Sequence, residues 1–510
     1  MANWLVELMP GWAARRAEAR LKMARYQLLE QGVRRAFEAA AVGRRNQGWK
    51  ATSKDANAEL APALARMRNR ARDQRRNNPY AESGISAIAD YSVGHGIVPR
   101  PLGRTDRVNE HLAELWKAWA ETTACDADGL NNFYGLQHLC ATTIPEAGEV
   151  LIRRRWRKAS DGLPLGMQLQ VLEPDYLDES KSGDLANGGR IIQGVEFDAI
   201  GRRVAYWLFS EHPGAMGYRH GLESKRVPAD DVLHVFMILR PGQARGYTWL
   251  APVLQRMKNL DEMDDAVIEQ AKIAACFAAF VSSDPTGEVQ AAKPPPLIDH
   301  VEPGIIEKLG PNESVTFGTP PTFSGYSAYS WQALHAVGVG LGVPYEILNG
   351  DLKGVNFSSG RMGWLRFYQR VHVWQWRMLI PLLCAGVWRW FLEAQLLQPD
   401  AVFEDVPAEW VPPRKVVLDP KAEGDATKES IRNGQMSWSD SVREQGYRNP
   451  RALAMAIAAD NTLFDELGIV LDCDPRKVGA AGAGTVSGSS EPDDQEKSKE
   501  TSETEATSDA

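Results

Sequence analysis

The sequence predicts an α+β protein of several domains, and three observations support this class. Short β-branched or alternating segments, separated by Gly, Asp and Pro, fill residues 146–237 and indicate strands. Two long helical patterns enclose a Pro- and Gly-rich insert, and a third long pattern follows a short hydrophilic loop. A chain of 510 residues with 44% apolar and 24% charged residues suffices for several globular cores, which excludes wholesale disorder.

The first 76 residues are expected to form a basic helical N-terminal arm. They hold 17 Lys/Arg and 7 Asp/Glu, a net charge of +10. A solvated arm, an anion-binding arm and a partner-binding segment are all compatible with this charge run. The N-terminus lacks a basic segment followed by an apolar one, so no signal peptide is expected there.

The body of the chain is acidic, in contrast to the arm. Residues 491–510 carry a net charge of −6, which leaves −12 for residues 77–490 within the total of −8. A protein that grips a duplex normally has a basic body, because its affinity comes from neutralising phosphates. Contact of this body with DNA is therefore expected to be weak outside the basic arm.

Residues 77–243 are expected to form a strand-rich domain that a helix introduces. Pro79 breaks the basic helix before it, and a new helix at residues 80–93 buries Ile85, Ile88 and Tyr91. The basic run at residues 153–158 continues the first strand, either as a solvent-facing hairpin end or as a nucleic-acid patch. Strands are expected at residues 150–152, 169–172, 190–197, 204–208 and 232–237.

Residues 244–282 are expected to form one long helix with a partly charged side. Apolar residues recur at three- and four-residue steps over about 30 residues, or roughly 45 Å. Such a helix is typical of a spanning strut or of the stem of an oligomer. The insert at residues 283–326 then lies between two helices, with a hairpin that turns at residues 310–312. The charged side consists of Asp261, Glu262, Asp264 and Asp265.

A second long helix, residues 327–348, precedes a hydrophilic loop at residues 349–358. The helix is expected to end near Val343, because Pro344 disfavours the α conformation of the residue before it. A loop with two glycines between long helices changes conformation at little cost in free energy. This suits a segment that contacts a partner without binding it tightly. The candidate functional residues of the loop are Asn349, Asp351, Lys353, Asn356 and Phe357.

A third long helix, residues 359–400, interleaves aromatic and arginine side chains. Ser358 and Ser359 are expected to cap its start, and Pro381 is expected to kink it. The pattern fits a core helix whose arginines reach water, and it also fits a subunit interface, where Trp and Arg are enriched. The interface candidates are Arg361, Trp364, Arg366, Arg370 and Trp374.

The C-terminal part divides into a helical segment and a polar tail. Residues 401–472 contain three helical patterns, which begin near Asp425, Ser437 and Pro450. Residues 473–510 lack aromatic residues and hold only two branched aliphatic ones, so they cannot offset the entropy of ordering. We expect a disordered acidic tail there.

The sequence predicts no catalytic residue, no metal site and no cofactor. It contains no GxxxxGK[ST], HExxH or GxSxG motif. Five cysteines without CxxC spacing indicate free thiols in a reducing compartment. The most apolar run has 11 residues, whereas a membrane span needs about 20, so no span is expected. The carboxylates considered as metal ligands and interpreted as surface or turn groups are Glu146, Glu149, Glu173, Asp175 and Asp178.

Three stretches of this sequence resemble the lambda-type portal proteins of tailed bacteriophages. They are RNNPYAESGISAIADYSVGHGIVP, PGQARGYTWLAPVLQRMKNLDEMDDAVIEQAKIAACFAAFV, and VGVGLGVPYEIL together with GVNFSSGRMGWLRFYQR. The resemblance covers about residues 60–400 in consistent order. It implies a ring, usually of twelve subunits, at one capsid vertex, through which a terminase motor drives double-stranded DNA and from which the DNA later leaves to the tail.

The resemblance also implies a part for each segment and a set of partners. The partners are further copies of the chain, double-stranded DNA, the terminase large subunit, major capsid or scaffold proteins and head-tail connector proteins, without a membrane. The protein is then expected in the virion, after assembly in the host cytoplasm. The parts are a wing (77–243), two stem helices (244–282 and 327–348), a clip (283–326), a tunnel loop (349–358), a long kinked helix (359–400) and a crown (401–472).

Two other classes stay open on the sequence. A DNA-processing enzyme such as a nuclease would need carboxylates clustered at strand ends to hold a metal ion. Magnesium-dependent plasmid cleavage would identify it. A different virion structural protein, such as a neck or capsid component, would lack the turbine-shaped ring with a central channel in electron micrographs.

Overall fold

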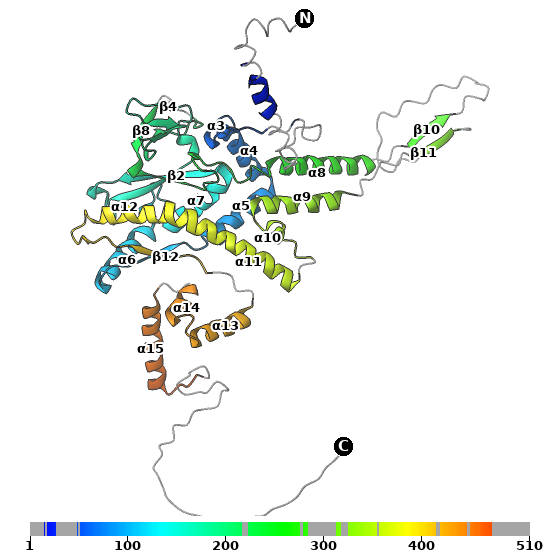
Figure 1. The fold of residues 1–510 in the computed structure, drawn as a ribbon. Coiled ribbons are helices and arrows are strands. Elements are labelled where there is room, and N and C mark those ends of the chain that lie inside the picture. Colours follow the sequence, from blue (N-terminus) through cyan, green and yellow to red (C-terminus); the bar gives the residue numbers. More distant parts are fainter. Residues whose placement is uncertain are drawn as a thin grey trace, which may run out of the picture. The chain divides into compact units, whose positions relative to one another are not determined.

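The structure is a computed structural model whose elements are drawn in Figure 1. It divides into two compact units, one of Met1–Ala63 with Arg240–Gln243 and one of Leu64–Leu239 with Ala244–Ala510. Helices and sheets are mixed in the second unit, which confirms the predicted α+β class. The described residues are 15, 18–26, 48, 51–216, 223–275, 279–283, 313–317, 325–353, 356–414, 419–445 and 449–471.

The smaller unit contains helix α3, Ala56–Leu60, and a helical stretch at residues 18–26. The side chain of Asp55 caps α3 by accepting a hydrogen bond from the Ala58 N–H at 2.9 Å. Arg240 belongs to this unit, and its guanidinium pairs with Glu59 at 2.5 Å. The predicted basic arm is therefore divided between the two units at Ala63.

Helices α4, Leu64–Asn77, and α5, Pro79–Ser92, open the second unit. The side chain of Asn78 accepts from the N–H groups of Tyr80 and Ala81, so it caps α5 where Pro79 ends α4. This confirms the predicted break. Ile85 and Ile88 are buried as predicted, and Tyr91 is half-buried.

Two antiparallel sheets form the strand-rich part of the second unit. Their orders are β3-β2-β9 and β4-β5-β6-β7-β8. Four of the five predicted strand segments are confirmed as single strands, whereas residues 190–197 form the hairpin β5-β6 with a turn at residues 193–194. Strands β4 and β8 are absent from the prediction, because GD and SKRVP have no apolar run. The strands are β2 Glu149–Trp156, β3 Met167–Leu172, β4 Gly183–Asp184, β5 Arg190–Ile192, β6 Val195–Phe197, β7 Arg203–Phe209, β8 Ser224–Pro228 and β9 Val232–Phe236.

The main hydrophobic core joins the three-stranded sheet to helices that precede and follow it in the sequence. Helices α6, Asp106–Ala120, and α7, Phe133–Ala147, contribute Trp119 and Phe133, which are fully buried. The Trp119 indole donates to the Met167 carbonyl at 2.8 Å, so its one polar group is satisfied. Strand β1, Val98–Pro101, pairs with β12, Ala408–Val411, at the edge of this core.

Helix α8, Leu254–Ala275, has 22 residues, so the prediction of about 30 is wrong. Pro252 restricts the backbone before it, and residues 251–253 form a turn instead of a first helical turn. Strand β10, Ala279–Ser283, pairs with β11, Glu313–Phe317. The predicted hairpin turn at residues 310–312 lies outside the described residues.

Helix α9, Tyr326–Leu341, packs beside α8 and ends at Gly342, whose φ is +78°. The Gly342 N–H donates to the Gly338 carbonyl at 2.7 Å, which closes the last turn. The predicted end near Val343 is confirmed, and Pro344 then leads into the short helix α10, Tyr345–Asn349.

The long third helix consists of three consecutive segments, shown in yellow in Figure 1. They are α11, Phe357–Trp374, a π-helical segment, Gln375–Cys384, and α12, Ala385–Gln395. Pro381 lies inside the π-helical segment, because the wider turn accommodates a residue that has no N–H. The Ala385 N–H accordingly donates to the carbonyl of Ile380, five residues earlier.

The predicted caps of this helix are wrong. The helix begins at Phe357, and the Gly360 N–H donates to the Asn356 carbonyl at 2.9 Å. Ser358 and Ser359 therefore lie in the first turn rather than at the position before it. Asn356 occupies that position, where asparagine is as favourable a residue as serine.

Three further helices follow, near the predicted positions. They are α13, Pro420–Arg432, α14, Trp438–Glu444, and α15, Pro450–Leu467. Asp419, Ser437 and Asn449 cap them with side-chain hydrogen bonds. The predicted tail at residues 473–510 lies outside the described residues. Among the described helices, none is long and apolar enough to cross a membrane.

Candidate functional site

The loop after α10 is held by its own short hydrogen bonds. Gly350 ends α10 at φ +69°, and the Asn349 side chain donates to the Tyr345 hydroxyl at 2.8 Å. A carboxylate oxygen of Asp351 accepts from the Lys353 N–H at 2.9 Å, which is an Asx-turn. These bonds are local, so the loop depends on α10 and on itself for its shape.

The described side chains of this loop differ in exposure, and Asn349 and Asp351 are half-buried. Leu352 is 70% exposed and Lys353 is exposed. Lys353 is the single Lys or Arg between residues 349 and 358. Within the described part of the chain, its ammonium forms no ion pair. Asn356 is exposed, and the structure does not describe the side chain of Phe357.

Two of the five interface candidates on α11 pack inside their own chain. The Trp364 ring meets Tyr91 edge-on at 5.4 Å between centroids. Trp374 is 6% exposed and lies against Trp249 at 5.3 Å. The three arginines, Arg361, Arg366 and Arg370, are exposed. The helix is thus a core helix on one side and solvent-facing on the other.

A buried charge network, missed by the sequence interpretation, lies at the start of β2. Glu149 is fully buried, and its carboxylate accepts from Arg245, from His234 and from the Gly246 N–H. The guanidinium of Arg245, also fully buried, donates to the Gln193 carbonyl at 2.9 Å. The expectation that Glu149 is a surface or turn group is wrong, because the loop before α8 folds over it.

The network assigns a neutral imidazole to His234. A nitrogen of Arg203 lies 2.9 Å from the Nδ1 atom of His234, and Nε2 lies 2.8 Å from a Glu149 oxygen. An arginine only donates and a carboxylate only accepts, so Nδ1 carries the lone pair and Nε2 the proton. Burial lowers the pKa of His234 to about 4, against the opposing effect of Glu149. Burial would raise the pKa of Glu149, but Arg245 and His234 together hold it below its usual range.

These directions predict a loss of stability in acid. Between the ordinary pKa of 6.5 for His234 and its folded value of about 4, the unfolded chain binds more protons. The contribution of neutral His234 to the stability of the folded chain is therefore complete above pH 6.5 and is lost as the pH falls towards 4. We expect the urea midpoint, followed by tryptophan fluorescence, to fall on acidification and to fall less in His234→Gln, which cannot titrate. Equal pH slopes in the two proteins would contradict this role of His234.

The basic helix α4 and the carboxylates of the sheet domain form a second ion-pair cluster. Arg68 pairs with Asp175 and Glu179 at 3.2 and 2.9 Å, and Arg72 pairs with Glu173 and Asp175 at 2.9 and 2.6 Å. Burial would raise the pKa of Asp175, but Arg72 and Arg68 outweigh it and hold the pKa below its usual range. Part of the predicted basic helix end is thus neutralised by its own chain.

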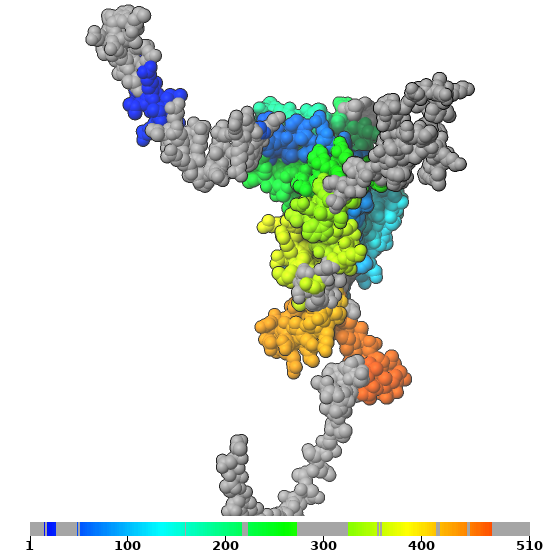
Figure 2. Space-filling view, turned by 90° about the vertical axis from the view of Figure 1, so that its right-hand side faces the viewer, coloured from blue at the N-terminus to red at the C-terminus, as the bar shows by residue number. Residues whose placement is uncertain are grey.

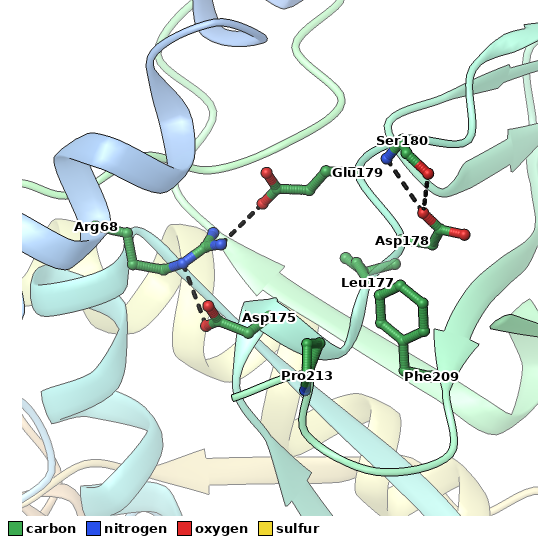
Figure 3. A pocket seen from close by; sticks show the side chains of 8 residues that line it. All are labelled: Arg68, Asp175, Leu177, Asp178, Glu179, Ser180, Phe209 and Pro213. Carbon is green, nitrogen blue, oxygen red and sulfur yellow. Dashed lines mark hydrogen bonds and ion pairs between the residues drawn. The ribbon is translucent and has the colours of Figure 1, made fainter. Parts of the chain in front are cut away.

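An open pocket lies beside this cluster, and Figure 3 shows the side chains that line it. Arg68 reaches into it from α4 and pairs there with Asp175 and Glu179. Glu173, Asp175 and His212 each offer one ligand atom, and these three atoms lie within 4.8 Å of one another, close enough to hold a cation. Both carboxylates already pair with Arg72, so the arrangement is an ion-pair cluster.

Within the basic run at residues 153–158, which begins inside β2, Arg154 differs from the expectation of a solvent-facing end. The side chain of Arg154 is only 8% exposed, and it pairs with Asp231 at 2.9 Å and with Glu393 of α12. Its guanidinium also lies over the Trp390 ring at 5.3 Å. Arg154 therefore ties the sheet to the long helix and does not belong to a free basic patch.

Comparison with known proteins identifies the class of this fold. A family model described as "Phage portal protein, lambda family" matches residues 42–375. The match covers more than half of the chain, so the protein is a phage portal protein, as the resemblance implied. The chain belongs to the lambda family of phage portal proteins.

Relatives and solved structures were found over most of the chain. A "Probable portal protein" of Halomonas phage phiHAP-1 is 29% identical over 471 residues, which is 86% of this chain and 89% of the relative. Portal protein B of Escherichia phage lambda is 25% identical over 358 residues, 62% of this chain and 66% of the relative. The neck of a native gene transfer agent particle, computed with C12 symmetry, has a TM-score of 0.46 at 12% identity and covers 74% of this chain and 90% of its own.

Proposed function

We propose that this protein assembles into a closed ring at one vertex of a phage capsid and that double-stranded DNA enters and leaves through the ring. The match of the lambda portal family model to residues 42–375 carries this proposal. Twelve subunits is the number that the family resemblance implies. The ring assembles in the host cytoplasm and stays in the virion, and it acts as a conduit without catalytic activity of its own.

The segments take the parts that the resemblance implies. Residues 77–243 form the wing, and α8 and α9 form the stem, because the two helices pack side by side and are joined through β10 and β11. The insert at residues 283–326 is the clip, which docks first the terminase large subunit and later the connector proteins. Residues 401–472 form the crown, and major capsid or scaffold proteins surround the wing.

Electron microscopy of the purified full-length protein tests this function. We expect turbine-shaped rings with a central channel and a mass near twelve times 56.4 kDa by light scattering. Monomers at micromolar concentration would contradict the ring. Closed assemblies without a channel would favour another virion structural protein. Magnesium-dependent cleavage of plasmid DNA that is lost in Asp175→Asn would favour an enzyme.

The loop at residues 349–358 is proposed to face the channel as the tunnel loop. A conduit must pass DNA without holding it, and each retained phosphate contact strengthens binding and its salt dependence. The acidic body, at −12 over residues 77–490, and a loop with one cation both suit this requirement. Asn349, Asp351, Asn356 and Phe357 would shape the loop, and Lys353 would touch phosphates briefly.

Lys353→Ala should leave ring assembly and early packaging unchanged and should lower the amount of DNA retained in full heads. One lysine near one phosphate releases about one counterion, so each contact is weak and the effect comes from the number of subunits. The length of nuclease-protected DNA at several salt concentrations measures this. Lys353→Arg keeps the charge and should retain DNA as the wild type does. Wild-type retention in Lys353→Ala would leave the lysine as a solubility residue.

A further inference from the structure

The solvent side of α11, continued by Trp376 and Arg377 at the start of the π-helical segment, combines exposed apolar and cationic side chains on one face. Met362, Leu365, Val373 and Trp376 are 69, 52, 42 and 54% exposed. They recur at steps of three and eight residues, which returns them to the same side of a helix. The arginines on this side are Arg366, Arg370 and Arg377, and these seven residues are the α11 face.

The helix that carries the α11 face has no carboxylate near the face to neutralise its arginines. The sequence contains no Asp or Glu from Leu352 to Leu392. Within the described residues, none of the three arginines forms an ion pair, in contrast to Arg389 further along, which lies 3.9 Å from Glu393. Figure 2 shows the yellow atoms around α11 at the surface of the second unit. The face therefore offers unpaired positive charge together with apolar area.

This composition favours a protein partner over DNA. Phosphates would neutralise the arginines but would leave the Trp376 ring and the aliphatic side chains in water. Protein interfaces are enriched in Trp, Met and Arg and cover both kinds of group together. A surface of acidic character with some apolar area is the complement that this face requires.

Helix α8 of the same chain presents such a surface. Glu262, Asp265 and Glu269 follow at steps of three and four residues, so they lie on one side of the helix. Ile268 beside them is 53% exposed, and no Lys or Arg occurs from Asn259 to Ala271. These four residues are the α8 face.

The carboxylates of the α8 face have only weak ion-pair partners, or none, among the described residues. Glu262 and Glu269 lie 3.3 and 3.6 Å from Lys258 and Lys272 in exposed pairs within one helix, which are weak. Asp265 forms no ion pair with any described residue. The neighbouring Asp261, by contrast, accepts hydrogen bonds from Asn78 and Gln74 inside the chain.

We propose that the α11 face of one copy of this chain docks on the α8 face of the next copy, with Arg366 and Arg370 opposite Asp265 and Glu269. Both pairs are four residues apart, which is about 6 Å along each helix. The two faces lie on different elements, so the contact is heterologous and closes into a ring when the rotation allows. The inference rests on the proposed ring and names the surfaces that join its subunits.

A charge exchange in the full-length protein tests the pairing. Arg366→Glu and Asp265→Arg should each lower the fraction of protein in rings about tenfold or more at micromolar concentration, because like charges then oppose each other at every interface. The double variant restores the opposite charges and should recover the rings. Arg107→Glu, at an exposed position on α6, should assemble as the wild type does.

Disulfide trapping gives a second measurement that does not depend on loss of assembly. With Cys276 and Cys473 replaced by serine, Arg366→Cys combined with Asp265→Cys should give a ladder of linked subunits on a non-reducing gel, and each single cysteine variant should not. The remaining cysteines, at 125, 140 and 384, are buried. The pairing would be overturned if intact rings gave no ladder or if Arg366→Glu formed normal rings. Neither outcome would contradict the proposed ring.

Two other outcomes separate this inference from its alternatives. A wild-type protein that forms no ring at all contradicts the proposed function, whatever the variants do. Arg366→Glu rings that assemble normally but retain less nuclease-protected DNA would assign the α11 face to the DNA and overturn the docking between copies.

Discussion

Glu149→Ala should lower the free energy of unfolding of the second unit by about 3–5 kcal/mol, because it leaves a buried guanidinium without its carboxylate. Glu149 and Arg245 are both fully buried, 2.6 Å apart at their closest atoms. His234 and the Gly246 N–H lose the same acceptor. The loop that carries Arg245 leads directly into α8, so the damage should reach the start of the stem.

Urea unfolding of the full-length protein, followed by tryptophan fluorescence, measures this effect. Glu409→Ala is the matched control, since Glu409 pairs with Arg100 at 2.9 Å with both side chains more than a third exposed. A surface pair of this kind contributes about 0–1 kcal/mol. Glu149→Gln should fall between the two, because the amide keeps an acceptor and loses the charge. A Glu149→Ala midpoint equal to that of Glu409→Ala would show that Arg245 reaches another partner or solvent.

The elements that could be predicted from sequence are those with a strong local signal. The predicted strands β2, β3, β7 and β9 alternate or are apolar, and Pro79 and Pro344 set helix ends through their own backbone geometry. The resemblance to lambda-type portal proteins supplied the division of the chain into wing, stem, clip, tunnel loop, long helix and crown. The interpretation of α8 as about 30 residues was wrong at both ends, because the apolar periodicity extends beyond the helix: α8 begins only after Pro252, and strand β10 already begins at Ala279.

The buried network could not be predicted, because its members are far apart in the sequence. Glu149 meets His234 across 85 residues and Arg245 across 96. The meeting depends on the register of β2 and β9, in which Leu151 lies opposite His234. One signal was present: a histidine within the otherwise apolar strand β9, where every residue is buried. A polar side chain at such a position requires a partner.

Some features of the candidate functional residues depend on neighbouring residues in the sequence, and others depend on residues far away in the sequence. Lys353 and its Asx-turn are a local feature, and the loop has the short-range bonds that its sequence favours. Which face of α11 is free depends instead on α5 and on the loop before α8, which cover Trp364 and Trp374. Their assignment to a subunit interface stays a prediction. The indole rings of Trp364 and Trp374 both pack against residues of their own chain.

Gly148→Ala should destabilise the second unit by about 3 kcal/mol or more, because the new methyl group has no room and the backbone is left-handed. Gly148 ends α7 at φ +95°, and a Cβ there would lie 2.2 Å from the carbonyl carbon of Tyr247. The obstacle is backbone rather than a flexible side chain. Relief would move residues 245–248 and with them the guanidinium that pairs with Glu149.

Gly129→Ala separates the two causes of this expected loss. Gly129 has a similar φ of +71°, and no atom lies within 4 Å of the place that a methyl group would take, so its substitution should cost only about 1–2 kcal/mol for the left-handed backbone. The same urea titration compares the two variants. If they lost equal stability, the close approach of the Tyr247 backbone would be irrelevant, and the loop over Glu149 would have to be looser than its contacts indicate. A larger loss in Gly148→Ala, together with the low midpoint of Glu149→Ala, would mean that the end of α7, the start of β2 and the loop before α8 form one rigid joint at the base of the proposed stem.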